Sequence, residues 1–424
     1  MAGRNHIAYD SYRVTAVLWL LAVLLGAVPY LLAGAVPSFT DALFESVSGF
    51  TTTGSSVVAE PEALPVWLRF WRAATQWIGG LGLVLFLVAF IPSLREGSAQ
   101  LYSAEFSGTQ QRKLHPRMSQ SVRRMWLIYG LMTLALASLL ALAGNDVADS
   151  VCLALSTVST GGFMTASTGL AGYSSLTMAI LTVFMFLSGV NVALIYNFFS
   201  FHWRRLRRSD ELIVYAAVFV AAVAGCTLAF VVVGNGVGRS ASYSLFHVAS
   251  TMSTCGFYTA TPAHWPFAAS VVTFLLILSG AMAGSTGGGL KLRRLMTLAL
   301  YLRNYFTRML HPNAVFTVKI DRKVVEGAYV NKIFGFVFLY ILFIIGGAFV
   351  LTLTGSGISE AFCLAAANIS NLGPSPIINT MGANLEYALL PAAAKWTLMV
   401  LMLAGRLEIF ALLAFVSPAY WRKR

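Results

Sequence analysis

The chain has 424 residues, of which 58% are hydrophobic and only 11% are charged. A soluble domain has about 25% charged residues, so this composition excludes an ordinary soluble protein. The formal net charge of +13 admits a nucleic-acid partner, but basic residues that flank apolar helices explain it better. The four cysteines lie at no metal-ligand spacing and predict no disulfide framework. We therefore expect an all-α integral membrane protein in a lipid bilayer, with no nucleic acid bound.

Long apolar runs follow one another from the N-terminus to the C-terminus. They lie at 17–30, 81–91, 127–143, 178–187, 212–233, 334–353 and 398–415. Most reach or approach the roughly 20 residues that a membrane-spanning helix needs. The first run is longer than the core of a typical signal peptide, so we expect it to be a retained helix.

Basic residues gather outside these runs. The N-terminus, the segments 95–124, 204–208 and 291–332, and the C-terminus hold 24 of the 29 lysines and arginines. The other five are Arg69, Arg72, Arg239, Lys395 and Arg406. The positive-inside rule then predicts a multi-pass protein with both termini and these three segments in the cytoplasm.

A hydroxyl-rich stretch with a glycine interrupts the apolar sequence four times. The stretches are SVSGFTTTGSS from Ser46, STVSTGGFMTAS from Ser156, STMSTCGFYTA from Ser250 and NISNLGPSP from Asn368. Aligned on one glycine each, they place Gly54, Gly162, Gly256 and Gly373 at spacings of 108, 94 and 117 residues. One such stretch is more often a helix break or a packing motif, but four copies at matched positions favour a repeated unit.

Each glycine has the same surroundings. Before it lies a segment too short to cross a bilayer, at 38–50, 147–158, 240–252 and 358–370, which we interpret as a re-entrant helix. Several of these segments begin with capping residues: Ser38 and Thr40, Asn145 and Asp146, Ser240 and Ser242. A full apolar helix precedes the short segment, and a second full helix follows the glycine.

The second helices share a mark near their middle, a pair made of a small residue and glycine. The pairs are Gly79-Gly80, Ser188-Gly189, Ser279-Gly280 and Ala404-Gly405. Close helix packing explains such pairs, although it does not explain their matched offset from the loop glycines.

The sequence thus predicts four pseudo-symmetric helix–pore-loop–helix units around one central pore. The expected units are 12–92, 121–203, 210–310, with its second helix interrupted at 283–289, and 330–421. Residues 93–120 and 311–329 are expected to be cytoplasmic connections.

Non-helical backbone at membrane depth is tolerated where it is buried or lines a water-filled cavity. Backbone carbonyls that line a narrow pore replace the hydration shell of an alkali cation. The predicted ion-binding filter consists of Thr52, Thr53, Gly54, Thr160, Gly161, Gly162, Thr254, Cys255, Gly256, Asn371, Leu372 and Gly373.

Two further features stand out inside the predicted helices. The glycine-rich stretch 283–289 cannot face lipid, so it faces the pore or protein, unless the helix simply ends there before a cytoplasmic linker. No strand precedes it and the GxxxxGK[ST] spacing is missing, which disfavours a phosphate-binding loop.

Arg406 lies roughly a dozen residues before the expected helix end at Pro418, too deep for easy snorkelling. A salt bridge between Arg406 and Glu408 is disfavoured within one helix, because these positions point in different directions.

Eight stretches, in order, resemble the Trk/Ktr/HKT superfamily of potassium transporters, most closely its TrkH/TrkG branch. They are FESVSGFTTTGSS (44–56), RAATQWIGGLG (72–82), STGGF (159–163), STCGF (253–257), AGSTGGGLKLRR (283–294), HPNAV (311–315), NLGP (371–374) and GRLEIF (405–410). Two departures accompany this resemblance. Members usually carry two further N-terminal helices, so the chain is either a short form or a truncation. The fourth filter lacks threonine.

The resemblance implies a bacterial inner-membrane protein whose four units surround a pore with the four glycines in its filter. It also implies a homodimer with one pore per subunit and a cytosolic ring of RCK-type, TrkA-like regulatory subunits. K⁺ is the transported ion; no cofactor is expected in this chain, and the nucleotide is expected on the regulatory partner. The implied gate is an intramembrane loop below the filter, formed by Gly284, Ser285, Thr286, Gly287, Gly288 and Gly289, with Lys291 and Arg406 beside it. Lys291, Arg293 and Arg294 would couple it to the partner.

Four classes of function come into question for this sequence. Potassium uptake through a channel-like pore agrees with the repeated loops and the resemblance. A sodium- or proton-coupled cation symporter is the alternative, although few acidic residues lie inside the helices and Glu408 is the main exception. No HExxH, GxSxG or paired intramembrane carboxylates indicate an enzyme. A scaffold role leaves the four matched loops unexplained.

Overall fold

The computed structural model describes residues 2–82, 118–259, 265–311, 317–374 and 387–416. In these ranges the chain is built from helices, with one small hairpin of strands β1 (Lys319–Ile320) and β2 (Lys323–Val324). The strands are antiparallel, and Ile320 is paired with Lys323. The predicted all-α membrane class is confirmed at this level.

Four long helices form the frame of the molecule: α1 (Ala2–Leu32), α6 (Met118–Leu142), α11 (Asp210–Val232) and α15 (Gly327–Leu353). Each contains an apolar stretch long enough to cross a membrane, and a fifth span is counted if the bent pair α8–α9 is taken as one, within the described ranges. Large apolar side chains such as Leu25, Leu32 and Phe338 are exposed on them. A helix that is apolar on its outer face as well as its inner face suits a lipid surround.

A short helix follows each long one: α2 (Phe39–Phe50), α7 (Val147–Val158), α12 (Val237–Ser253) and α16 (Ile358–Ile369). All four match the short helices predicted from the sequence. Ser38 caps α2 and Asp146 caps α7, as expected, through side-chain oxygens that accept from backbone N–H groups. The expectation for Ser240 and Ser242 is wrong, because α12 begins three residues before Ser240 and the Ser240 hydroxyl donates to Gly236 O instead.

The helices that come after the glycine loops are α3 (Val66–Gly80), α8 (Ser175–Ser188), α13 (Phe267–Ser279) and α18 (Ala392–Arg406). The short 3-10 helices η1 (Pro61–Ala63) and η3 (Tyr387–Leu389) precede α3 and α18. After the breaks the chain continues in α9 (Val192–Phe199), α10 (Trp203–Leu206), α14 (Leu292–Leu310) and α19 (Phe410–Val416).

These breaks correct the prediction of full-length second helices with one interruption at 283–289. The chain bends by 108° between α8 and α9, and a further break separates α18 from α19. The small residue–glycine pairs therefore lie at helix ends rather than near mid-helix. The physical reason is close packing: a Cβ on Gly79 would overlap Phe50 O, and one on Gly405 would overlap Ile369 O.

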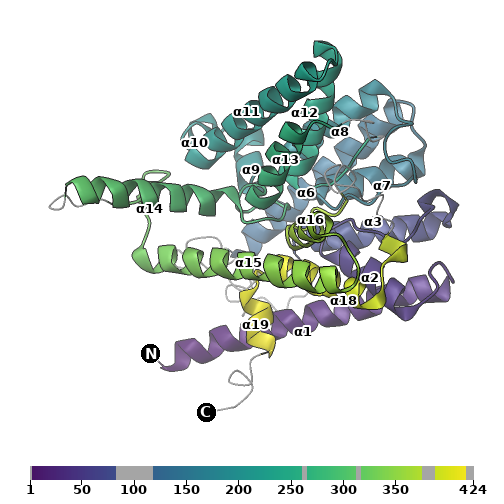
Figure 1. Cartoon of the computed structure of the whole chain (residues 1–424), viewed down its shortest axis with the longest axis horizontal. Coiled ribbons are helices and arrows are strands. Elements are labelled where there is room, and N and C mark those ends of the chain that lie inside the picture. Colours follow the sequence, from purple (N-terminus) through teal and green to yellow (C-terminus); the bar gives the residue numbers. More distant parts are fainter. Residues whose placement is uncertain (1, 83–117, 260–264, 312–316, 375–386, 417–424) are drawn as a thin grey trace.

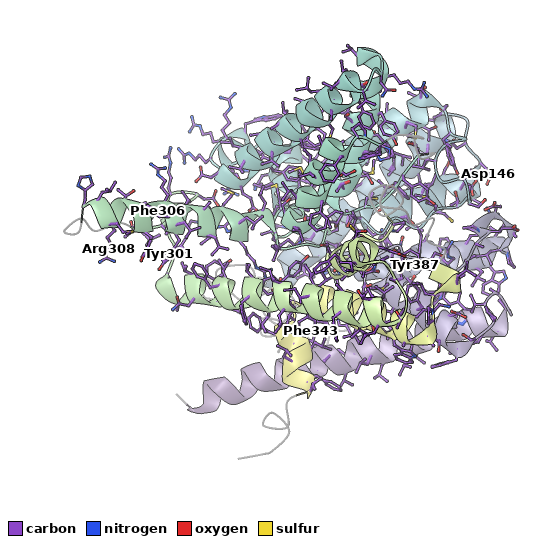
Figure 2. All side chains as sticks on the ribbon, in the orientation of Figure 1. Asp146, Tyr301, Phe306, Arg308, Phe343 and Tyr387 are labelled. Atoms are coloured by element: carbon purple, nitrogen blue, oxygen red, sulfur yellow. The ribbon has the colours of Figure 1, made fainter. Side chains whose placement is uncertain are left out.

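Two hydrophobic cores hold the helices together. One joins α1, α2 and α3 to α15, α16 and α18, and the other joins α6, α7 and α8 to α11, α12 and α13. The loops at the ends of the short helices contact one another, and Figure 1 shows α16 near the middle of the molecule. Figure 1 also shows α14 projecting from the body beside α15. Tyr301 lies on the α15-facing side of α14 in Figure 2, and its ring centroid is 5.4 Å from that of Phe334.

Candidate functional site

The four loops after the short helices share an unusual backbone conformation. Their glycines have positive φ angles of 86° (Gly54), 76° (Gly162), 82° (Gly256) and 69° (Gly373). The residues two positions earlier are also left-handed, with φ of 56° (Thr52), 56° (Thr160), 61° (Thr254) and 53° (Asn371). A left-handed residue other than glycine is uncommon, so its recurrence at one position of all four loops marks a shared local structure.

The glycines contact one another's loops in a closed cycle. A Cβ on Gly54 would overlap the carbonyl oxygen of Gly161 in the second loop, and one on Gly162 would overlap Cys255 O in the third. Gly256 stands in the same relation to Leu372 O in the fourth loop, and Gly373 to Thr53 O in the first. The twelve residues predicted as a filter are thus brought together, because each glycine approaches the carbonyl that precedes the next glycine in the cycle.

The fourth loop keeps this conformation without a threonine. Asparagine adopts left-handed angles more readily than most residues, which suits Asn371 to the place that Thr52 has in the first loop. Its amide donates to the Thr53 hydroxyl at 3.1 Å and to Met402 O at 2.9 Å. The sequence departure is therefore compatible with the shared backbone.

A buried ion pair supports the first loop from behind. Arg72 of α3 donates to a Glu45 carboxylate oxygen of α2 at 2.8 Å, and both side chains are almost fully buried. The same carboxylate accepts from Ser56 Oγ at 2.9 Å and from Val57 N at 3.1 Å. Sequence reasoning missed this network. The sequence did hold a signal for it: Arg72 lies outside the basic segments predicted to be cytoplasmic, and a buried arginine needs a partner.

A second buried pair joins α2 to α18. Lys395 Nζ lies 2.6 Å from a carboxylate oxygen of Asp41 and donates to Ala388 O at 2.9 Å. Both side chains are only 8% exposed. The pair therefore connects an element near the N-terminus to one near the C-terminus.

The segment between α13 and α14 crosses the ends of the short helices. The Thr286 hydroxyl is within 3.2 Å of both Val158 O, at the end of α7, and Ser188 O, at the end of α8. Gly288 N donates to the Thr254 hydroxyl at 2.7 Å, and a Cβ on Gly288 would overlap Ser370 O, just after α16. Ser285 and Thr286 are buried. The glycine-rich stretch therefore lies directly against three of the four loop-bearing elements.

Arg406 connects the same segment to the end of α3. Its guanidinium donates to Thr286 O at 3.1 Å, to Gly80 O at 2.6 Å and to Gly79 O. Arg406 is the last residue of α18, which corrects its expected mid-helix position. Breaking the helix frees backbone carbonyls at the end of α3 as acceptors, and a guanidinium can serve several of them at once.

The basic residues after the segment have partners within the chain. Lys291 Nζ donates to Gly287 O. Arg294 is buried and lies 2.6 Å from a Glu408 carboxylate oxygen, and Arg293 lies 3.1 Å from Asp321 and 3.6 Å from Glu211. These contacts tie the segment to α11, to the β-hairpin and to the break before α19.

Similarity to known proteins identifies the family of this chain. The family model described as TrkH, cation transport protein, matches residues 5–423. The chain belongs to the TrkH family of cation transport proteins. The predicted resemblance is thereby confirmed.

Individual relatives match this TrkH-family chain over almost its whole length. It is 33% identical over 422 residues to the Trk system potassium uptake protein TrkH of Escherichia coli, covering 98% of this chain and 86% of the relative. It is 31% identical over 423 residues to TrkG of Escherichia coli, with 97% and 85% covered. The crystal structure of the potassium transporter TrkH from Vibrio parahaemolyticus superposes with a TM-score of 0.85 at 30% identity, over 98% of this chain and 86% of that one. These relatives are named as potassium uptake proteins or a potassium transporter, in line with the transport function predicted from the sequence.

Proposed function

We propose that this chain takes up K⁺ through a pore lined by the four glycine loops. The observation that carries the proposal is the closed cycle in which each filter glycine approaches the carbonyl before the next one. Such a ring presents backbone oxygens to one axis, and carbonyl oxygens can replace the water around an alkali cation. The ends of α2, α7, α12 and α16 meet at this ring and add the negative ends of four helix dipoles.

The proposed units are those expected from the sequence, 12–92, 121–203, 210–310 and 330–421. Four long helices, each followed by a short one and a left-handed glycine loop, support this division. The relatives' names, which specify potassium uptake, support the choice of ion.

The same proposal assigns the segment from Gly284 to Gly289 as a gate, with Lys291 and Arg406 holding it. Its contacts with the ends of α7, α12 and α16, and with α3 through Arg406, support an obstructing position beneath the ring. A cation that leaves the ring on this side would meet a buried segment and a fixed positive charge. The segment must move before ions can pass.

The setting of the pore belongs to the proposal as well. We place the chain in the bacterial inner membrane as a homodimer, with both termini and the basic connections 93–120 and 311–329 in the cytoplasm. A nucleotide-binding regulatory subunit of RCK type would dock on that face and control the gate. The naming of the relatives as members of a Trk system supports a multi-component transporter.

Cation flux into reconstituted vesicles tests the function directly. Purified protein would be reconstituted at known density, and uptake would be measured with K⁺ or Na⁺ as the sole permeant cation. We expect K⁺ uptake to exceed Na⁺ uptake and to be unaffected by an imposed pH or Na⁺ gradient. Uptake that requires either gradient would favour the symporter alternative. Equal leakage of both ions would refute a selective ring.

A further inference from the structure

One loop of the ring is held by a side chain from a neighbouring element. Gln76 of α3 donates through Nε2 to Gly161 O at 2.8 Å and accepts through Oε1 from Phe163 N at 3.2 Å. Arg72, one turn earlier on the same face of α3, donates to Met164 O at 3.3 Å. Three backbone groups of the second loop are therefore bound to α3, although the loop itself follows α7.

Gln76 also fills a volume that the second loop leaves empty. The position before the filter glycine carries a side chain in three loops, where it is Thr53, Cys255 and Leu372, but it is Gly161 in the second loop. A Cβ on Gly161 would overlap the Gln76 amide and lie 2.8 Å from Gln76 Cβ. Gln76 thus occupies the space where a side chain of Gly161 itself would lie.

The other second helices carry no equivalent polar group. The residue three positions before each small residue–glycine pair is Gln76 in α3 but Met185 in α8, Leu276 in α13 and Leu401 in α18. Methionine and leucine have no N–H to donate to a carbonyl. The arrangement is therefore particular to the contact between α3 and the second loop.

We propose that Gln76 is a positioning residue for ion selectivity, which acts by fixing the carbonyl of Gly161 in the ring. Glycine without a side chain has wide conformational freedom, so Gly161 relies on Gln76 to hold its peptide group. The hydrogen bond from the Gln76 amide also uses one of the two lone pairs of Gly161 O, and this lowers the electron density that the oxygen can offer to a cation. The inference rests on the proposed filter, because Gly161 O belongs to the cycle that faces Gly54.

Replacing Gln76 by methionine tests the inference, because the volume stays and both hydrogen bonds are lost. We expect the ratio of K⁺ to Na⁺ uptake per folded pore to fall about 2- to 13-fold, which corresponds to the loss of one hydrogen bond of about 0.5–1.5 kcal/mol at Gly161 O. Gln76→Glu, which keeps an acceptor for Phe163 N but has no N–H for Gly161 O, should also lower the ratio. Met185→Leu, at the matching position of α8, is the control and should leave the ratio within about twofold of wild type.

A second test removes the side chain at position 76 of α3 and adds one at position 161 of the second loop. This test does not depend on the folding of Gln76→Met or Gln76→Glu. Gly161→Ala alone should fold poorly because its Cβ meets Gln76, whereas Gln76→Gly combined with Gly161→Ala removes that overlap. We expect the double variant to be recovered in higher folded yield than Gly161→Ala, and to be more selective for K⁺ than Gln76→Gly. A double variant with no advantage over either single variant would overturn the inference.

The same assay separates this inference from the proposed filter. Gly162→Ala changes a ring glycine directly and serves as the positive control. If Gly162→Ala alters the K⁺/Na⁺ ratio while Gln76→Met leaves it unchanged, the role of Gln76 is refuted and the filter stands. If neither changes the ratio, the filter assignment itself is wrong. Size-exclusion elution of each variant gives the folded fraction to which uptake is normalised.

Discussion

Arg406→Gln should increase cation flux through pores that lack the regulatory subunit. The guanidinium donates to Thr286 O in the proposed gate and to Gly79 O and Gly80 O at the end of α3, so it bridges the gate to a fixed helix. A hydrogen bond from a charged group contributes about 1.5–3 kcal/mol. If only the bond to Thr286 O is lost when the gate opens, its removal shifts the closed–open equilibrium by about 10- to 150-fold.

Flux per pore should rise by a similar factor as long as the open state of the wild type is rare. The assay is K⁺ uptake into vesicles at matched content of folded protein, because a lower yield would otherwise hide a gain per molecule. Arg406→Lys is the informative companion. It keeps the positive charge but has a single ammonium group in place of the planar fork that serves three carbonyls.

The two variants separate three roles for Arg406. If the residue latches the gate through its hydrogen bonds, both variants raise flux. If it acts as a fixed electrostatic barrier, Arg406→Gln raises flux and Arg406→Lys does not, because the repulsive charge remains. If it only stabilises the fold, yield falls and flux per pore does not rise. Unchanged or lower flux in normally folded Arg406→Gln would refute both the latch and the barrier.

Three further predictions follow from the described contacts. Gly→Ala at Gly54, Gly162 or Gly256 should lower K⁺ preference over Na⁺, because the added Cβ meets a neighbouring carbonyl and the residue has positive φ; wild-type selectivity in all three variants would sink the filter assignment. Deleting residues 284–289 should give partner-independent uptake with selectivity retained, and a folded deletion variant with unchanged or abolished uptake would show that the segment is no closed gate. Lys395→Met should destabilise the protein by about 3–5 kcal/mol, measured by thermal or denaturant unfolding in detergent, because Asp41 stays buried without its ion partner. Adding Asp41→Asn to Lys395→Met should recover most of that loss, whereas no recovery would mean that the pair contributes little.

Periodic features of the sequence were the ones that could be predicted. The apolar runs gave the long helices, and the matched glycines gave the loops, because both depend on local composition and on repetition along the chain. The short helices α2 and α7 even begin at the caps expected for them, Ser38 and Asp146. Asn371 could not be predicted as a left-handed residue from its own loop. In the structure Asn371 has a positive φ, as do Thr52, Thr160 and Thr254 at the matching position of the other three loops.

Contacts between distant segments could not be predicted from the same patterns. The second helices break at their small residue–glycine pairs because the ends of the short helices approach there, and this depends on tertiary packing rather than on propensity. Arg406 consequently lies at a helix end. A usable signal did exist in the five basic residues outside the segments predicted to be cytoplasmic. Arg69 pairs with Asp149 at 3.0 Å, and Arg72, Lys395 and Arg406 all have buried or partly buried acceptors.

Gln76 contacts one loop of the ring, the second, and a single chain makes such an unequal arrangement possible. In a pore made of four identical subunits, a glutamine that fills a missing side chain would appear four times and would require glycine at all four positions. A single chain with four unequal repeats can install Gln76 against one loop and keep Thr53, Cys255 and Leu372 in the others. The same freedom permits one arginine, Arg406, to donate to Thr286 O in the proposed gate. The proposed selectivity and gating would therefore depend on particular contacts between neighbouring units, such as those of Gln76 and Arg406, and the variants above test these contacts one at a time.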